Sequence, residues 1–366
     1  MTWLRQWLVT GLLLALMLGL GAALWILPDQ ALSYTERRKL AQRPELSAEA
    51  VFSSAFSGEL EDYLLDQFPA REAFRRLKAQ ISFGLLRRQD NNGIYLWQDG
   101  VYRQEYPLNE DQLRYGARKL NTLFAGALEG MNVSYAVIPD KNCYAAGAAG
   151  QLHLDYDQLR ETLRAEIDSG IREIALYDCL DAGDYFRTDP HWRQERLERV
   201  LARLGEALEI ALPTPDSYTP ASFAPFYGAY YGQAALPVEP DTLYYLESDT
   251  TRGATVTTLD TGETAGLYQP EAYDGMDGYD LFLGGAAAVQ VLHNPGGPAG
   301  KELVIFRDSF ASSLAPLLLE AYETITLIDL RYISAERACQ LVAFDQQQDV
   351  LFLLSTLVWN HAAMLR

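Results

Sequence analysis

The pattern of apolar and polar residues begins with one long, uninterrupted apolar segment. Trp7–Leu27 contains no charged side chain, which supplies about the twenty apolar positions that a helix needs to cross a bilayer. Arg5 precedes the segment and Asp29 follows it, so the positive-inside rule places the N-terminus in the cytoplasm and the rest of the chain outside. The alternative is a cleaved signal peptide, but the apolar run continues beyond the small residues that a cleavage site would need. Residues 1–30 are therefore predicted to form a cytoplasmic stub and an uncleaved, single-pass anchor in the cell membrane.

Residues 31–105 form a separate segment in the pattern. Polar and charged residues at 33–46 suit a juxtamembrane linker. Apolar residues then recur at helical intervals over 56–81, and Pro69 divides them into two expected helices that dock on the following domain. An Asp-Gly turn within residues 94–102 predicts a small hairpin.

Residues 106–366 alternate between helical and strand patterns. The expected helices are 110–128, 156–168, 191–211, 310–321 and 334–342, and the expected strands are 133–138, 174–177, 303–306, 324–328 and 350–354. This alternation predicts an α/β fold with a mostly parallel sheet flanked by helices. Residues 213–300 are Pro- and Tyr-rich and less regular, and they are expected to form a variable insertion, either loops over the active site or a small β subdomain.

The composition excludes several kinds of partner and cofactor. The chain has 366 residues and a formal net charge of −19, so most of its body would repel nucleic acid and anionic bilayer surfaces. Its three cysteines, Cys143, Cys179 and Cys339, stand far apart with no histidine at metal-ligand spacing, which indicates core thiols rather than a zinc site or a disulfide framework. We expect no metal, no cofactor and no nucleic-acid partner.

A serine follows one of the expected strands directly. The strand Leu303–Phe306 leads through Arg307 and Asp308 to Ser309, where the next expected helix begins. A side chain at such a turn projects from the carboxyl edge of a parallel sheet, where the active sites of open α/β folds lie. Its backbone N–H, at a helix N-terminus, can stabilise an oxyanion. The alternative is that Ser309 only caps the helix.

A serine nucleophile needs a base, and His191 has the strongest local context. Asp189 lies two residues upstream in an expected extended segment, where its carboxylate can orient the imidazole. The alternative is that His191, beside Trp192, is a packed or capping residue. His293 is the competing base, but no acidic residue lies near it in sequence. We expect Asp189, His191 and Ser309 to follow the carboxyl ends of sheet strands.

The run Asp189-Pro190-His191-Trp192 resembles the Asp-His-His-Trp signature of the DHHW family, whose members are similar to the SGNH-like acetyltransferases of alginate O-acetylation. Only the second position departs from the signature. The resemblance extends to the segments Pro139-Asp140-Lys141, Tyr227–Tyr231, Arg307–Ser313 and Asp329–Tyr332. Arg307 replaces the glycine of the usual SGNH Gly-Asp-Ser, which leaves the nucleophile in place and adds bulk near it.

The resemblance implies an SGNH-hydrolase-like domain with Ser309, His191 and Asp189 as its triad, transferring acetyl groups to a polysaccharide outside the cell. It also implies a membrane-bound O-acyltransferase that delivers acetyl groups across the bilayer. Further candidates for substrate or oxyanion contacts are Lys141, Gly228, Arg307 and Tyr332. Two alternatives remain at this point: a carbohydrate acetyl esterase with the same triad, and a non-catalytic glycan-binding or assembly protein.

Overall fold

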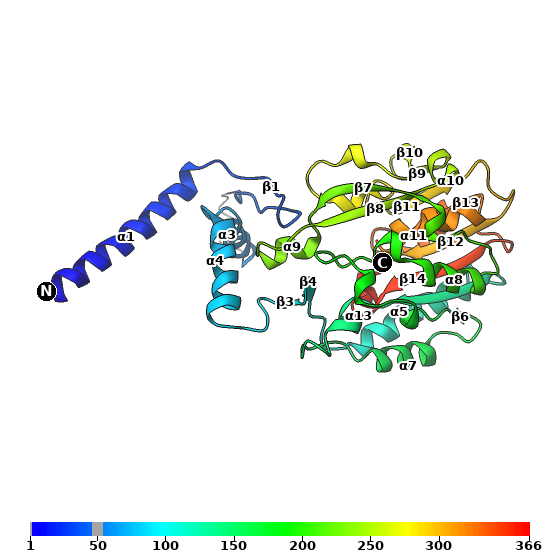
Figure 1. The fold of residues 1–366 in the computed structure, drawn as a ribbon, viewed down its shortest axis with the longest axis horizontal. Coiled ribbons are helices and arrows are strands. Elements are labelled where there is room, and N and C mark those ends of the chain that lie inside the picture. Colours follow the sequence, from blue (N-terminus) through cyan, green and yellow to red (C-terminus); the bar gives the residue numbers. More distant parts are fainter. Residues whose placement is uncertain (1, 46–53) are drawn as a thin grey trace. The chain divides into compact units, whose positions relative to one another are not determined.

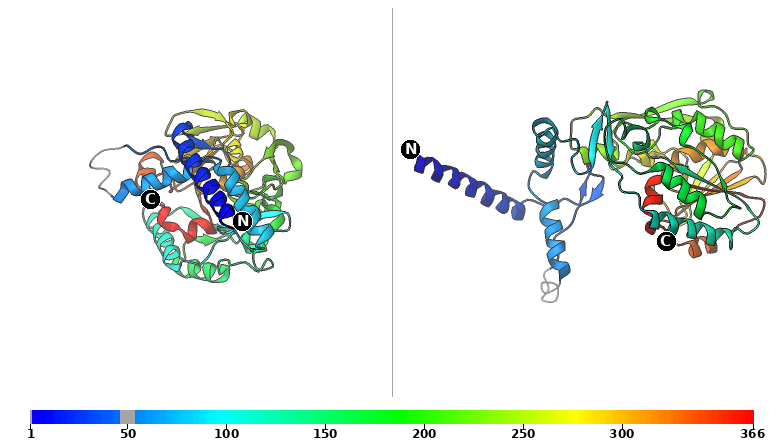
Figure 2. Two further views of the ribbon diagram at one scale, coloured as in Figure 1. Left: turned by 90° about the vertical axis from the view of Figure 1, so that its left-hand side faces the viewer. Right: turned by 90° about the horizontal axis from the view of Figure 1, so that it is seen from below.

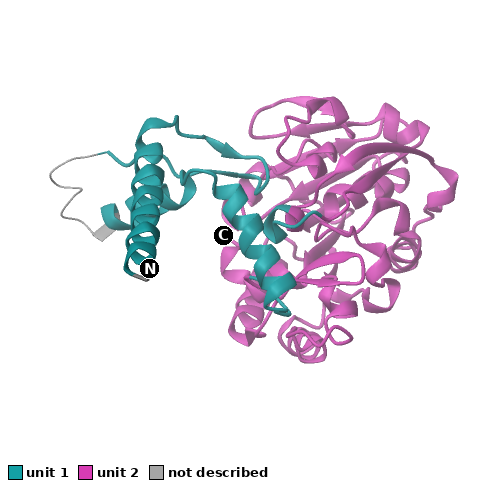
Figure 3. Ribbon diagram, turned by 60° about the vertical axis from the view of Figure 1, so that its left-hand side comes forward, with its two compact units in different colours: residues 1–91, 232–237 teal, residues 92–231, 238–366 magenta. Residues whose placement is uncertain are grey.

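The computed structural model describes residues 2–45 and 54–366. The chain divides into two compact units, which are residues 1–91 with 232–237, and residues 92–231 with 238–366 (Figure 3). The hairpin of β3 (Ile94–Trp97) and β4 (Gly100–Arg103) belongs to the second unit.

The first unit begins with α1 (Thr2–Ile26), a single uninterrupted helix (Figure 1; Figure 2). Its residues Trp3–Ile26 are long and apolar enough to cross a membrane, a property that a signal sequence would share. The unit continues with β1 (Leu32–Ser33), β2 (Arg38–Lys39), α3 (Ser54–Asp66), α4 (Arg71–Gln80) and one π-helical turn at Ile81–Leu85. The break between α3 and α4 contains Pro69, as the sequence predicted.

The second unit is built on an eight-stranded sheet in the order β10-β9-β11-β13-β12-β14-β5-β6. Neighbouring strands from β13 to β6 run parallel, and β11, β9 and β10 extend the sheet in antiparallel fashion. The strands are β5 (Asn132–Ile138), β6 (Arg172–Glu173), β9 (Thr255–Thr258), β10 (Thr264–Gly266), β11 (Val289–His293), β12 (Glu302–Arg307), β13 (Thr324–Ile328) and β14 (Asp349–Ser355). The predicted α/β class with a mostly parallel sheet is confirmed.

Helices cover both faces of this sheet, because its central strands are apolar on both sides (Figure 1). In β12, Leu303 and Ile305 pack with α8 and α11, whereas Val304 and Phe306 belong to the opposite layer, with α5 and α7. The helices of the unit are α5 (Glu110–Phe124), α6 (Asn142–Ala145), α7 (Tyr156–Glu166), α8 (Glu198–Ala207), α10 (Asp249–Gly253), α11 (Ala311–Leu318), α12 (Ala335–Leu341) and α13 (Thr356–Asn360), with α9 (Ala229–Ala234) crossing into the first unit.

Two predicted elements differ from the structure. No strand forms at 174–177, since the short β6 ends just before it at Glu173, and the helix expected from residue 191 begins at Glu198. Residues 191–193 stay outside the helix because the Phe186 N–H donates to the carbonyl of His191 and Trp192 is fully buried, and Gln194–Arg196 form a 3-10 turn. The insertion at 213–300 forms the separate ribbon of β7 (Thr219–Phe226) and β8 (Asp241–Glu247) and also supplies β9, β10 and β11 to the main sheet.

Candidate active site

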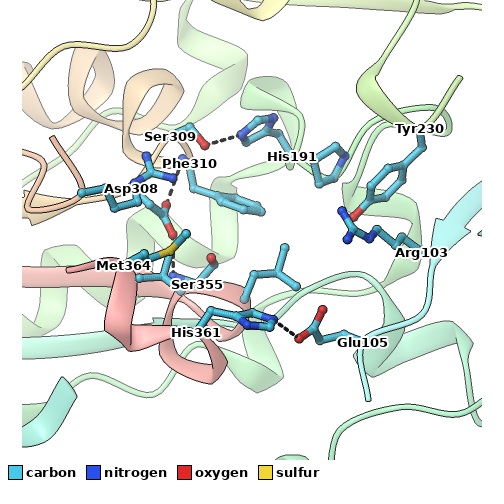
Figure 4. Close-up of a pocket in the computed structure, with 14 residues that line it drawn as sticks. Arg103, Glu105, His191, Tyr230, Asp308, Ser309, Phe310, Ser355, His361 and Met364 are labelled. Carbon is cyan, nitrogen blue, oxygen red and sulfur yellow. Dashed lines mark hydrogen bonds and ion pairs between the residues drawn. The ribbon is translucent and has the colours of Figure 1, made fainter. Parts of the chain in front are cut away.

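Ser309, His191 and Asp189 meet in one hydrogen-bonded chain, although the serine and the histidine are 118 residues apart. His191 Nε2 lies 2.7 Å from Ser309 Oγ, and Nδ1 lies 2.6 Å from Asp189 Oδ1. Figure 4 shows the Ser309 hydroxyl pointing at the imidazole. The carboxylate accepts the Nδ1 proton, which leaves Nε2 free to accept the proton of the serine. This is the relation that a nucleophile, a base and its orienting acid require.

Asp308 stabilises the turn that carries Ser309 through two hydrogen bonds to backbone N–H groups. Asp308 is buried, and its Oδ1 accepts the Phe310 N–H at 3.1 Å while its Oδ2 accepts the Ser355 N–H at 2.7 Å. The alternative that Ser309 caps α11 is wrong, because its hydroxyl bonds His191 and Phe310 holds the cap position. Among the hydrogen bonds of the described residues, none uses the Ser309 N–H as a donor, so that group is open to an oxyanion.

Asp189 and His191 come from a long loop after β6, and do not follow a strand end directly as expected. Lys141, which is 3% exposed, holds this loop. Its Nζ lies 2.9, 3.0 and 3.1 Å from the carbonyls of Phe186, Arg187 and Asp189. Burial lowers the pKa of Lys141 to about 7, and three acceptors engage all three N–H groups of the ammonium form. Lys141 therefore acts on the loop and does not serve as a surface charge.

Gly228 packs against the loop that carries Asp189, and its N–H does not face an oxyanion as the sequence indicated. Its N–H, expected to face an oxyanion, donates to Thr188 Oγ1 at 2.9 Å. The next N–H, of Ala229, donates to Asp189 Oδ2 at 2.8 Å. A side-chain Cβ on Gly228 would stand 2.2 Å from the Thr188 carbonyl oxygen. The absence of a side chain thus lets this segment approach closely enough to orient Asp189.

Arg307 and Tyr332 lie outside the pocket that contains Ser309. Arg307 is 2% exposed and donates to Ser312 Oγ at 3.0 Å and Gln290 Oε1 at 2.8 Å, behind the serine turn. Burial lowers the pKa of this guanidinium. Tyr332 is half exposed. Among the described residues that line the pocket, its neighbour Arg331 is present and Tyr332 is not. The expectation that Arg307 and Tyr332 contact the substrate is therefore wrong, and both residues only neighbour the site.

The pocket beside Ser309 has a volume of about 220 Å³ and polar walls on one side. Arg103 and Glu105 line it, and Glu105 Oε1 lies 2.6 Å from Nε2 of His361 (Figure 4). Arg331 lines another part, fixed by the carboxylate of Asp329 at 2.9 and 2.6 Å. The volume is below the ~300–1,000 Å³ of a pocket for a drug-sized ligand. It suits a small group, with most of a larger ligand outside.

Tyr279 supports the histidine from the insertion. Its ring stacks on the imidazole of His191, with centroids 3.8 Å apart and planes inclined by 7°. Its hydroxyl donates to Ser313 Oγ at 2.9 Å, and Trp192 Nε1 donates to the same oxygen at 3.0 Å. Burial raises the pKa of Tyr279, which keeps the hydroxyl protonated as this donor. Sequence reasoning missed Tyr279, because no spacing relates it to His191.

Comparisons with known proteins find DHHW proteins both by sequence model and by fold. The family model described as DHHW protein matches residues 176–328, which contain Asp189, His191 and Ser309. A DHHW family protein from Eubacterium siraeum is similar in structure, with a TM-score of 0.62 and 19% identity over 75% of this chain and 95% of that chain. Bacillus cereus PatB1 has a TM-score of 0.58 and 17% identity over 74% and 97% of the two chains.

The structure of Bacillus cereus PatB1 with a sulfonyl adduct has a TM-score of 0.57 and 16% identity over 73% of this chain and 95% of that chain. No curated protein sequence matches the chain. At these identities the structural likeness concerns the fold. The family match spans the segment that holds the aspartate, histidine and serine, and together with the fold it makes the chain similar to DHHW proteins.

Proposed function

We propose that the chain is an O-acyltransferase with a serine nucleophile. More specifically, we propose an O-acetyltransferase that modifies a polysaccharide outside the cell. The observation that carries the proposal is the hydrogen-bonded chain from Ser309 through His191 to Asp189. A serine hydroxyl is a weak nucleophile until an oriented base can take its proton. A purely glycan-binding protein would have no need of this arrangement.

In the first half of the proposed reaction, Ser309 Oγ attacks the carbonyl carbon of an acetyl ester while its proton passes to His191 Nε2. The negative charge that develops on the carbonyl oxygen is stabilised by the Ser309 N–H. His191 then gives its proton to the departing alcohol, and the acetyl group remains on Ser309 as an ester. Asp189 stabilises the imidazolium throughout.

In the second half, an acceptor hydroxyl gives its proton to His191 and attacks the acetyl-serine. Collapse of the tetrahedral intermediate transfers the acetyl group to the acceptor and returns the proton to Ser309 Oγ. Water in the same position would make the chain an esterase. The polar wall formed by Arg103, Glu105 and His361 supports a sugar acceptor, because it places several hydrogen-bonding groups beside the serine.

We further propose that α1 remains in the membrane and places the second unit outside the cell. The length and apolar character of the helix support this placement, as does Arg5 near its cytoplasmic end. The acetyl donor would then be a membrane-bound O-acyltransferase that carries acetyl groups across the bilayer. A mature protein that begins after residue 27 would contradict the proposed membrane anchor. It would not affect the proposed reaction at Ser309.

The test of the reaction uses the full chain in detergent with an activated acetyl ester and an oligosaccharide acceptor. We expect acetate release by the native chain and a loss of at least about 10³-fold in Ser309→Ala, because the residues of a triad act as a unit. Mass spectrometry of the acceptor separates the two reactions, since acetylated sugar supports the transferase and free acetate alone supports the esterase. Equal rates in the native chain and Ser309→Ala would refute both.

A further inference from the structure

The first unit carries an apolar surface unrelated to the pocket. Phe74, Leu77, Ile81 and Leu85 recur along α4 and the π-helical turn that follows it, at a spacing that places them on one side of the helix. Their exposed fractions are 46%, 50%, 39% and 76%. We call these four residues the apolar stripe. A continuous exposed apolar surface of this kind marks an interaction site.

Another side of the same helix already contacts the rest of the first unit. Arg71 Nη1 bonds the carboxylate of Glu36, and Arg75 Nη2 lies 3.4 Å from the same group. Further along, Ala79 and Ser82 are buried. These contacts fix the rotation of the helix about its axis, so the apolar stripe is the outward side of a packed helix.

The charge of this segment is opposite to that of the whole chain. Residues 71–88 hold six basic side chains against the single acid Glu72, a net charge of +5, whereas the chain as a whole carries −19. The basic residues that are exposed are Arg76, Lys78, Arg87 and Arg88. A basic helix with an apolar side is typical of a segment that lies on a membrane surface. Long basic side chains can bury their stems in the interface and keep their charges at the phosphates.

Hydrogen bonds tie the end of α3, the helix that precedes α4, to the residues that follow α1. Tyr63 OH donates to Asp29 Oδ1 at 2.9 Å, and Gln67 exchanges hydrogen bonds with the backbone of Gln30 at 2.8 and 2.9 Å. Because α4 begins four residues after Gln67, it lies close to the point where the chain leaves α1. If α1 crosses a bilayer, these bonds keep α4 at the bilayer surface.

We infer that the apolar stripe lies in the headgroup region of an anionic phospholipid bilayer, with the exposed basic residues at the lipid phosphates. Each such cation contributes on the order of fivefold in affinity for an anionic surface. This segment of an otherwise acidic chain has the charge for that contact. The interaction would hold the first unit flat on the membrane, in addition to any anchoring by α1, and it does not depend on the chemistry of Ser309.

The test maps what the helix touches in the full chain, reconstituted in nanodiscs of phosphatidylcholine with or without phosphatidylglycerol. A photo-crosslinking residue, p-benzoylphenylalanine, replaces Leu77 or Ile81, and in the matched control it replaces Gln80, an exposed residue of α4 outside the apolar stripe. Mass spectrometry then counts lipid adducts. We expect at least about tenfold more adducts at the two stripe positions than at the control, and fewer when phosphatidylglycerol is left out.

A second variant tests whether the lipid contact depends on the apolar stripe. The double substitution Leu77→Ser and Ile81→Ser should leave ester hydrolysis unchanged, since both side chains are exposed in the first unit, and should lower the adducts formed by a photo-crosslinking residue at Leu85. Equal lipid labelling at all positions, or labelling at position 85 that ignores the double substitution, would overturn the inference. Crosslinks from the stripe to a second copy of the chain, or in native membranes to another protein, would overturn it in favour of a protein partner.

Discussion

Substitution of Gly228 by alanine should disable the site without changing any reacting atom. The added Cβ would stand 2.2 Å from the Thr188 carbonyl oxygen, 2.3 Å from its carbon and 2.5 Å from Cβ of Asp189, whereas real Cβ atoms essentially never come closer than 3.0 Å. Two of these atoms belong to the backbone, so the clash cannot be relieved by a side-chain rotation. The loop at residues 188–189 and the segment at Gly228 must therefore separate by about 0.8 Å, the difference between 2.2 and 3.0 Å.

That separation breaks the support of Asp189 by the Ala229 N–H and tilts the carboxylate away from His191. A misplacement of about 1 Å costs roughly 10²-fold in rate, and complete loss of the orienting carboxylate in serine enzymes costs about 10⁴-fold. We therefore expect kcat/KM for an activated acetyl ester to fall by about 10²–10⁴-fold. Overpacking should also lower the free energy of unfolding by about 1–3 kcal/mol, measured by denaturant titration.

Gly253 supplies the matched control. It is the last residue of α10, and a Cβ there would meet no atom within 4 Å. Gly253→Ala should leave kcat/KM unchanged and alter the free energy of unfolding by about 1 kcal/mol at most. The double variant Gly228→Ala with Asp189→Asn should be no slower than Asp189→Asn alone, because both changes act on one hydrogen bond. Near-native activity in Gly228→Ala would refute this reasoning, and losses that add in the double variant would show that Gly228 acts on the reaction by another route.

Two further predictions concern residues around the triad. Because the pKa of Lys141 is about 7, the ammonium form is present below that pH and loses a proton above it. The loop that carries Asp189 then loses one hydrogen-bond donor. The kcat/KM of the native chain should therefore decline from about pH 7 upward. Lys141→Met should be slower and lack this decline, and a profile identical to the native one would contradict the role of Lys141. His361→Ala should raise the KM for an oligosaccharide acceptor several-fold and leave hydrolysis of a small ester unchanged. The reason is that His361 belongs, with Glu105, to the polar wall of the pocket. His293→Ala, an exposed site on β11, is the control, and equal KM values in the two variants would remove His361 from acceptor binding.

The parts of the site that the sequence predicted are those with a local signal. A buried strand followed by Arg307-Asp308-Ser309 placed the serine at the edge of the sheet, and the two-residue spacing of Asp189 and His191 matches their hydrogen bond. The parallel strands were recognisable because both of their faces are apolar.

The parts that the sequence did not predict depend on contacts between distant segments. Glu105 and His361 are 256 residues apart, and the stacking of Tyr279 on His191 leaves no trace in the spacing of either residue. The helical pattern from residue 191 was overridden by burial of Trp192, whose indole donates to the Phe310 carbonyl at 3.1 Å. The sequence also cannot show that the Gly228 N–H is already occupied by Thr188, which is why an oxyanion role was expected there.

The central claim, that Ser309 is the nucleophile activated by His191, is tested most directly by covalent labelling with a sulfonyl fluoride. An activated serine displaces fluoride from this reagent and passes its proton to the base, so the adduct identifies the nucleophile. Ser355 is the control, because it lines the same pocket and has no histidine partner among its described hydrogen bonds. Peptide mass spectrometry of the labelled full chain should find one adduct, on Ser309, in step with loss of ester hydrolysis, and none in His191→Ala under the same conditions. An adduct on Ser355 or elsewhere, or full labelling of Ser309 with activity intact, would contradict the claim.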